Sequence, residues 1–193
     1  MIWGILSEAQ KLALKPHIAG KVVHDLGAGT CDLSVELCSL GAKHILAYDT
    51  NPSLSVKKPD NLTVRKKSFQ DLLGTLQPEI VFVSWPTIAE GDCTALTFLA
   101  SRAKKVIYLG KCMDGMMCGT NKFFSIIICS ELLEHVPDRR NTMLITGNSL
   151  PEAREWVPEE VAGIYRDKIY YYDEEYGDDT SSESEPGVWS VFW

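Results

Sequence analysis

The chain has 193 residues, of which 45% are hydrophobic, and a formal net charge of -7. This length suffices for one domain with a sizeable core and is too short for two ordinary ones, so we expect a single domain over residues 1–193. No apolar run approaches the roughly 20 residues that span a bilayer, and the N-terminus lacks the pattern of a signal peptide, which predicts a cytoplasmic protein with no membrane partner.

The negative charge is concentrated near the end of the chain. Seven of the 26 acidic residues lie from Asp173 onward, where there is no basic residue, so residues 1–172 carry 19 acidic and 19 basic side chains. A protein that binds nucleic acid through its phosphates usually has a basic excess, which this neutral body lacks. We therefore expect nucleic acid not to be the main partner.

The predicted elements alternate along the chain. A short helix at residues 7–16 begins at the N-cap candidate Ser7 and ends at Pro16. Strands are then predicted at 21–26, 44–49, 62–66, 79–85 and 105–110, and helices at 30–41, 69–76, 93–103 and 123–136. Strands spaced by helices imply parallel crossovers, so the predicted fold class is α/β, a doubly wound, Rossmann-like and mostly parallel sheet.

The last third of the sequence has a different character. Residues 142–146 and 168–173 are typical of strands, and residues 151–165 of an irregular helix interrupted by proline. An acidic loop at about 173–187 precedes a strand-like end at 188–193. Because an apolar end is unusual for a disordered tail, we interpret these segments as an antiparallel C-terminal edge; an acidic interaction tail is the alternative.

The stretch "HDLGAGTCDLS" at residues 24–34 predicts a nucleotide loop. It does not fit the GxxxxGK[ST] pattern of a P-loop, and the GxGxxG pattern of dinucleotide folds fails because Asp32 follows Gly27 and Gly29, where its carboxylate would repel a pyrophosphate. S-adenosylmethionine (SAM) has no phosphates. An acid at the strand end, here Asp25, can hold its ammonium, and Asp49 at the end of the next strand can hold its ribose diol.

Three stretches carry a resemblance to a known family. Residues 22–52, "VVHDLGAGTCDLSVELCSLGAKHILAYDTNP", resemble the first two motifs of the class I SAM-dependent methyltransferases. Residues 64–72, "VRKKSFQDL", and 80–86, "IVFVSWP", are similar to the next motif and to the fourth, so the resemblance covers about residues 20–111. It implies a class I methyltransferase fold and SAM as cofactor.

The resemblance also implies roles for single residues. The methionine part of SAM would be lined by Asp25, Gly27 and Gly29, the ribose hydroxyls would be bound by Asp49 with Thr50 and Asn51 beside it, and the adenine would be edged by Ser68 and Phe69. Two positions depart from the family pattern. Cys31 stands where a third glycine is usual, and Ser68 stands where an acid often meets the adenine amino group, which a hydroxyl does more weakly.

The fourth motif concerns the methyl acceptor. In amino-group methyltransferases it reads Asp, Asn or Ser, then Pro, Pro and an aromatic residue; here Ser84 and Pro86 match while Trp85 and Thr87 do not. The resemblance implies that Ser84, Trp85 and Pro86 form the acceptor wall, with the ring of Trp85 stacked on a flat or cationic acceptor or packed on the cofactor. The stretch is also similar to an uncharacterised group of small methyltransferase-like proteins with SWPP-Y at this point.

The leading functional expectation is SAM-dependent methyl transfer to a small molecule or a protein side chain, with nitrogen as the preferred acceptor. Two alternatives stay open: a domain that binds SAM or a partner without turnover, and a nucleic-acid methyltransferase. The six cysteines form no CxxC pair and no zinc spacing, and no cluster resembles the metal ligands of catechol-type methyltransferases, so no metal is expected. No residue pattern decides the oligomeric state.

Overall fold

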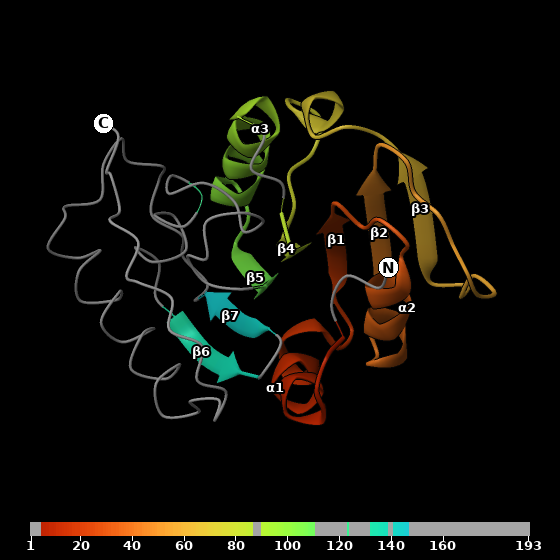
Figure 1. The fold of residues 1–193 in the computed structure, drawn as a ribbon, viewed down its shortest axis with the longest axis vertical. Coiled ribbons are helices and arrows are strands. Elements are labelled where there is room, and N and C mark those ends of the chain that lie inside the picture. Colours follow the sequence, from red (N-terminus) through yellow and green to blue (C-terminus); the bar gives the residue numbers. More distant parts are fainter. Residues whose placement is uncertain (1–4, 87–89, 111–122, 124–131, 139–140, 147–193) are drawn as a thin grey trace, which may run out of the picture.

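The computed structural model describes residues 5–86, 90–110, 123, 132–138 and 141–146 (Figure 1). Within these residues the helices are α1 (Glu8–Ile18), α2 (Asp32–Ser39) and α3 (Glu90–Ser101), with a short 3-10 turn η1 (Gln70–Leu72). The strands are β1 (Val22–Leu26), β2 (His44–Asp49), β3 (Leu62–Lys66), β4 (Ile80–Ser84), β5 (Lys105–Gly110), β6 (Leu132–Pro137) and β7 (Thr142–Thr146).

The strands form one sheet in the order β3-β2-β1-β4-β5-β7-β6. Neighbours from β3 to β5 are parallel, whereas β7 is antiparallel to both β5 and β6. The order runs outward from β1 in two directions, so the carboxyl ends of β1 and β4 flank a topological switch point, where open α/β sheets bind ligands. The predicted doubly wound, mostly parallel sheet is confirmed.

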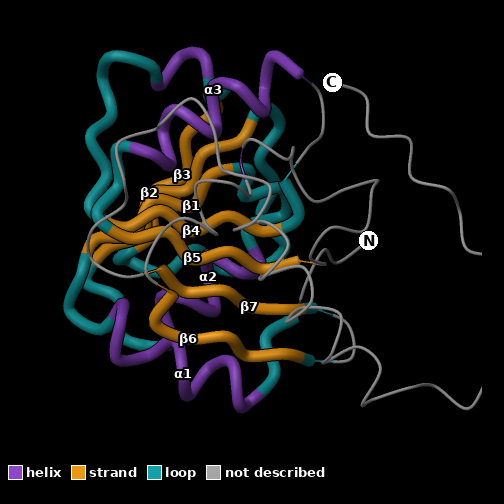
Figure 2. The backbone as a smooth tube through the Cα atoms, turned by 90° about the vertical axis from the view of Figure 1, so that its left-hand side faces the viewer, coloured by secondary structure: helices purple, strands orange, loops and turns teal. Residues whose placement is uncertain are grey.

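Helices cover both faces of the sheet, and Figure 2 shows α3 on one side with α1 and α2 on the other. The side chains of strand β4 pack against both helical layers. Ile80 and Phe82 belong to the core cluster that includes the buried leucines of α1 and α2, while Val81 and Val83 belong to the cluster beneath α3. Successive side chains of a strand point to opposite faces, so a central strand buried on both faces is continuously apolar.

The prediction of a helix over residues 123–136 was wrong at its end, because residues 132–137 form strand β6. His135 pairs with Leu144 and Val136 with Met143 in β7, and a register shift lies between Leu132 and Glu134. A short apolar run is consistent with a buried strand as well as with a helix, and periodicity alone does not separate the two. Residues 124–131 lie outside the described part of the chain.

The other predicted helix boundaries differ less from those in the structure. Ser7 caps α1 through reciprocal hydrogen bonds with Gln10, as expected, but the helix continues past Pro16 to Ile18. The helix predicted at 69–76 is only the turn η1, and α3 begins three residues earlier than predicted. The predictions for residues 151–165, 168–173, 173–187 and 188–193, and with them the extent of the single domain, lie outside the described residues.

None of the helices in the described residues is long and apolar enough to cross a membrane.

Candidate functional site

The glycine loop begins where β1 ends. Gly27 and Gly29 have φ values of 81° and 52°, in the left-handed region that glycine enters without steric cost. The backbone N–H groups of Gly27 and Ala28 both donate to the carbonyl oxygen of Tyr48, at 2.9 and 3.0 Å, and this ties the loop to the end of β2. The predicted loop between strand and helix is therefore formed by residues whose backbone requires glycine.

Cys31, in the place of the third glycine, also has a left-handed backbone, with φ of 56°. Its N–H donates to the carbonyl oxygen of Ala28 at 2.8 Å, and its side chain is fully buried in the core cluster of α1 and α2. Burial, with a smaller contribution from Asp25, raises the pKa of the Cys31 thiol to about 11. The thiol is therefore neutral at pH 7 and fills the core as a small apolar group.

Asp49 closes the loop from the end of β2. Its Oδ2 accepts the backbone N–H of Gly29 at 2.9 Å, and its Oδ1 accepts that of Asn51 at 2.8 Å. Each carboxylate oxygen can accept a further hydrogen bond, and the side chain is half-buried on a pocket wall. The carboxylate is thus held rigidly while it keeps acceptor capacity for a diol.

Asp25 lies beneath the glycine loop, 1% exposed. Its Oδ2 accepts a hydrogen bond from the hydroxyl of Ser34 in α2, while its Oδ1 has no hydrogen-bond partner among the described residues. Burial raises the pKa of the Asp25 carboxyl to about 7, against the lowering effect of the Ser34 hydrogen bond, and the charge of Asp49 raises it further. Such an unpaired buried carboxyl oxygen is costly unless a donor or a cation satisfies it.

An open pocket of about 230 Å³ lies at the carboxyl ends of β1, β2 and β4. Eight of the predicted site residues line it: Gly27, Asp49, Thr50, Ser68, Phe69, Ser84, Trp85 and Pro86. Asp25, Gly29 and Asn51 are adjacent in sequence to lining residues or bonded to one, but do not line the pocket themselves. The structure therefore brings the residues predicted for the cofactor and for the acceptor together around one space.

Close to the residues that precede η1, the pocket wall contains Asp92, which no sequence motif indicates. Ser68 and Asp71 exchange two hydrogen bonds at the start of η1, since the N–H of Ser68 donates to Asp71 Oδ2 at 2.9 Å and the N–H of Asp71 to Ser68 Oγ at 3.2 Å. Asp92, from the first turn of α3, also lines the pocket and accepts a 3.0 Å hydrogen bond from Gln70 Nε2 on its Oδ1. Its sequence neighbourhood matches no motif, so only the fold reveals it.

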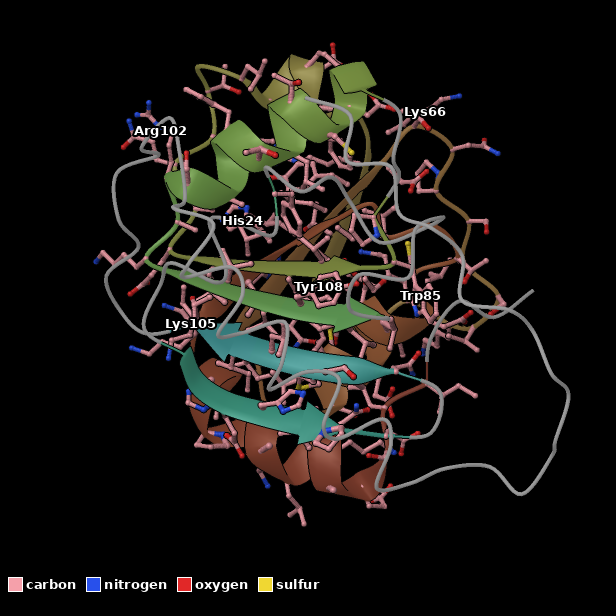
Figure 3. The ribbon with its side chains drawn as sticks, turned by 60° about the vertical axis from the view of Figure 1, so that its left-hand side comes forward. His24, Lys66, Trp85, Arg102, Lys105 and Tyr108 are labelled. Atoms are coloured by element: carbon pink, nitrogen blue, oxygen red, sulfur yellow. The ribbon has the colours of Figure 1, made fainter. Side chains whose placement is uncertain are left out.

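Trp85 follows β4 and has a φ of 46°. A left-handed backbone costs a residue other than glycine about 1–2 kcal/mol, so neighbouring contacts must hold this turn. The N–H of Trp85 donates to the carbonyl oxygen of Leu109 in β5 at 2.9 Å, and its indole Nε1–H donates to Asn141 Oδ1 at 3.2 Å. Figure 3 places Trp85 beyond the carboxyl ends of the parallel strands, on the side of the pocket.

The described residues contain no group of three or more His, Cys, Asp or Glu side chains that could hold a metal ion. The polar side chains of the pocket wall are instead two carboxylates, three hydroxyls and one ammonium group, from Asp49, Asp92, Thr50, Ser68, Ser84 and Lys67.

The sheet has five parallel strands in the order β3-β2-β1-β4-β5, and the antiparallel β7 lies beside β5. This strand order is that of the class I SAM-dependent methyltransferase fold. The glycine loop, the carboxylate at the end of β2 and the pocket at the switch point occupy the places where this fold binds its ligand.

Comparison with known proteins supports this fold. The chain is similar to yhhF of Escherichia coli, provisionally assigned as a methyltransferase, at 16% identity and a TM-score of 0.52 over 72% of this chain and 82% of that one. It is also similar to Sp1610 of Streptococcus pneumoniae, provisionally assigned as a tRNA (m1A22) methyltransferase, at 12% identity and a TM-score of 0.53 over 89% and 85% of the two chains.

A third similar structure is the 1,6-didemethyltoxoflavin-N1-methyltransferase of Burkholderia thailandensis, with bound 1,6-didemethyltoxoflavin and S-adenosylhomocysteine (SAH). It matches at 12% identity and a TM-score of 0.50, over 72% of this chain and 76% of that one. No protein-family model and no curated sequence matches the chain. At these identities the likeness lies in the fold.

Proposed function

We propose that this protein binds SAM and transfers its methyl group to a nitrogen atom of a small molecule or a protein side chain. One observation carries the proposal. The same pocket, at the switch point of the sheet, is lined by residues from four separate segments that resemble methyltransferase motifs. Three of these segments resemble the cofactor motifs and the fourth resembles the acceptor motif. An enzyme that joins two substrates requires such a shared space.

The residues fit the chemistry of SAM. Its ammonium, bound beside the glycine loop, would lie near the buried Asp25 and favour the ionised form of that carboxyl. Its ribose diol would donate to Asp49, whose two oxygens already face the loop at fixed positions. Phe69, whose ring lies 3.5 Å from the position of a Cβ added to Gly27, would pack on the adenine.

The start of α2 fits a phosphate-bearing cofactor poorly. Asp32 stands in the first turn of α2, where a pyrophosphate would bind, and its carboxylate accepts hydrogen bonds from the hydroxyls of Thr30 at 2.6 Å and Ser55 at 2.9 Å. These bonds hold the charge at the helix N-terminus. A phosphate at that point would face a carboxylate instead of free N–H groups.

When bound, SAM supplies an electrophilic methyl group on a positively charged sulfur. The methyl group moves in line to the acceptor nitrogen, which loses a proton, and neutral SAH remains. The residues of this chain contribute orientation, which can supply much of the acceleration of such a displacement. The Ser84 hydroxyl and the backbone carbonyl before Pro86 would accept hydrogen bonds from the nitrogen, and the ring of Trp85 would hold a flat or cationic acceptor.

Two measurements test the proposal. Calorimetry with SAM and SAH should show binding, and no binding of either would reject the cofactor assignment. Radiolabelled SAM should then transfer its methyl group to a component of metabolite, peptide or nucleic-acid pools, and the label should resist mild acid and base as an N-methyl group does.

The same screen separates the two alternatives. Trp85 and Thr87, which depart from the amino-methyltransferase motif, favour a domain that binds SAM without turnover. The fold shared with a protein provisionally assigned to tRNA favours a nucleic-acid acceptor. Tight SAM binding with no labelled product in any pool would support the first alternative, and label only in the nucleic-acid pool would support the second.

A further inference from the structure

We propose that Asn141 is a positioning residue that fixes the direction of the Trp85 indole ring, and through it the acceptor wall. This inference deepens the proposed function and rests on it. Asn141 immediately precedes β7, lies 56 residues from Trp85 in sequence, and belongs to none of the motifs.

The backbone of Trp85 is held independently of its ring. The hydrogen bond from its N–H to the carbonyl oxygen of Leu109 continues the pairing of β4 with β5 by one residue, and its left-handed φ turns the chain away from the sheet. Neither feature determines the side-chain torsion angles. The ring is half-buried and lies at an open pocket, so contacts must select one of the orientations that its rotamers allow.

The hydrogen bond from Trp85 Nε1 to Asn141 Oδ1 makes that selection. Asn141 is only 3% exposed, and its amide group is engaged at both ends, because its Nδ2 donates to the carbonyl oxygen of Ile5 at 3.1 Å. A flipped amide would set two donors face to face at Trp85 and two acceptors at Ile5. The acceptor oxygen that meets the indole therefore has a defined position.

The backbone of Asn141 is anchored as firmly as its side chain. Its carbonyl oxygen accepts the N–H of Asp138 at 2.9 Å and the Nε2 of Gln10 at 3.2 Å. Gln10 is fully buried, and its Nε2 also lies 3.2 Å from the carbonyl oxygen of Val136 in β6. The start of α1 and the two antiparallel strands thus form a fixed base, and Asn141 connects this base to the ring.

Among the described residues, this network reaches the pocket through Trp85 alone. The glycine loop and Asp49 are held by their own bonds to Tyr48 and Asn51, which do not involve Asn141. A change at Asn141 should therefore alter the acceptor side much more than cofactor binding.

Three variants separate the contributions. Asn141→Leu keeps the branched side chain of four heavy atoms and removes both hydrogen bonds. Asn141→Asp keeps an acceptor for the indole but replaces the donor to Ile5 by a second acceptor. The matched control is Asn61→Leu. Asn61 Nδ2 donates to the carbonyl oxygen of Ala42 at 2.9 Å, and the residue precedes β3 at the opposite edge of the sheet.

The first readout needs no acceptor. The chain has five tryptophans, so its ¹⁵N-labelled form should show five indole N–H signals, and the signal lost in Trp85→Phe identifies Trp85. We expect Asn141→Leu to shift this signal and raise its solvent exchange about tenfold, as loss of one hydrogen bond implies, while Asn141→Asp and Asn61→Leu keep its protection. Unchanged protection in Asn141→Leu would overturn the proposal, as would equal loss in Asn141→Leu and Asn141→Asp.

The second readout uses SAH and the acceptor that the labelling screen identifies. Asn141→Leu should raise the KM for that acceptor or lower kcat at least about tenfold while the Kd for SAH changes less than about threefold, and Asn141→Asp should restore most of the loss. In a Trp85→Phe background, Asn141→Leu should add nothing. A full additional loss there would show that Asn141 acts by another route.

The outcomes remain distinct from those of the proposed function. A wild type that binds no SAH rejects the proposed function, and with it the role of Asn141 in an acceptor wall, whereas SAH binding with an unaltered Trp85 signal rejects only the role of Asn141. If circular dichroism shows that Asn141→Leu does not fold, Trp85→Phe removes the same bond from the other side. It should then shift the Asn141 side-chain amide signal and weaken acceptor use, and an unchanged amide signal would refute the contact.

Discussion

Replacing Asp49 by alanine perturbs the most firmly held carboxylate of the pocket. In the free protein the change removes the acceptors of two backbone N–H groups, those of Gly29 and Asn51. Both groups lie where water can replace the carboxylate, because Gly29 is half-buried and Asn51 is exposed, so we expect the fold to persist. In the complex, the change removes the charge-assisted partner of the ribose diol.

The loss of that partner should weaken binding by about 1.5–3 kcal/mol. At 1.4 kcal/mol for each tenfold change, this corresponds to a rise in Kd of about 10- to 150-fold for both SAM and SAH. Calorimetry on the wild type, Asp49→Ala and the control Asp60→Ala measures it. Asp60 is an exposed acid that does not line the pocket, so its variant corrects for the change in net charge.

A ligand lacking one hydroxyl provides a sharper check. The 2′-deoxy analogue of SAH should bind the wild type more weakly than SAH does, and the Asp49→Ala change should cost this analogue less. Equal losses for SAH and the deoxy analogue would show that Asp49 acts only by shaping the glycine loop. An unchanged Kd in a folded Asp49→Ala protein would refute its role altogether.

Three further predictions concern the charge and shape of the pocket. NADH and ATP should fail to displace SAH at micromolar concentrations, because Asp32 at the start of α2 opposes phosphates, and competition by either would contradict the choice of cofactor. Trp85→Ala should lower turnover more than it lowers SAM affinity. The control Phe98→Ala alters an exposed ring on α3 and should change neither quantity. A parallel fall of turnover and affinity in Trp85→Ala would place the ring of Trp85 on the cofactor instead. The pKa of Asp25, raised from 3.8 to about 7, means that the folded state binds the proton more tightly, so folding stability should fall as pH rises from about 4 to about 7. At about 1.4 kcal/mol per pKa unit, the free energy of unfolding should decrease by on the order of 4 kcal/mol over this pH range. Denaturant titrations of Asp25→Asn should show no such decrease. An identical pH profile in that variant would assign the dependence to another group.

Much of the fold could be predicted because its central strands are apolar on both faces. The segment that became β4 has Val81, Phe82 and Val83 in succession, a pattern that few exposed elements share. The same property makes residues 123–136 ambiguous, because their apolar run predicts a helix although its end forms β6. The choice there depends on pairing with β7, a contact between segments that the local pattern does not contain.

The site likewise contains residues that the sequence predicts and residues that it does not. Residues at strand ends, such as Asp49 and Ser84, could be predicted because parallel strands bring their carboxyl ends to one edge. The burial of Asp25 beneath the loop could not, because it depends on how α2 packs on β1 and on the bond to Ser34. Asn141 gave no signal at all, since its role arises from contacts with Trp85 and Ile5, which lie far from it in sequence.

The left-handed Cys31 has a consequence for recognising related chains. Its side chain points into the core and is absent from the pocket wall, so a ligand would meet the same surface as if glycine stood there. Cysteine also restricts the unfolded chain more than glycine would, which partly offsets its backbone strain. A search pattern that demands three glycines would pass over sequences built this way, whereas a pattern that allows a small buried side chain at the third position would retrieve them.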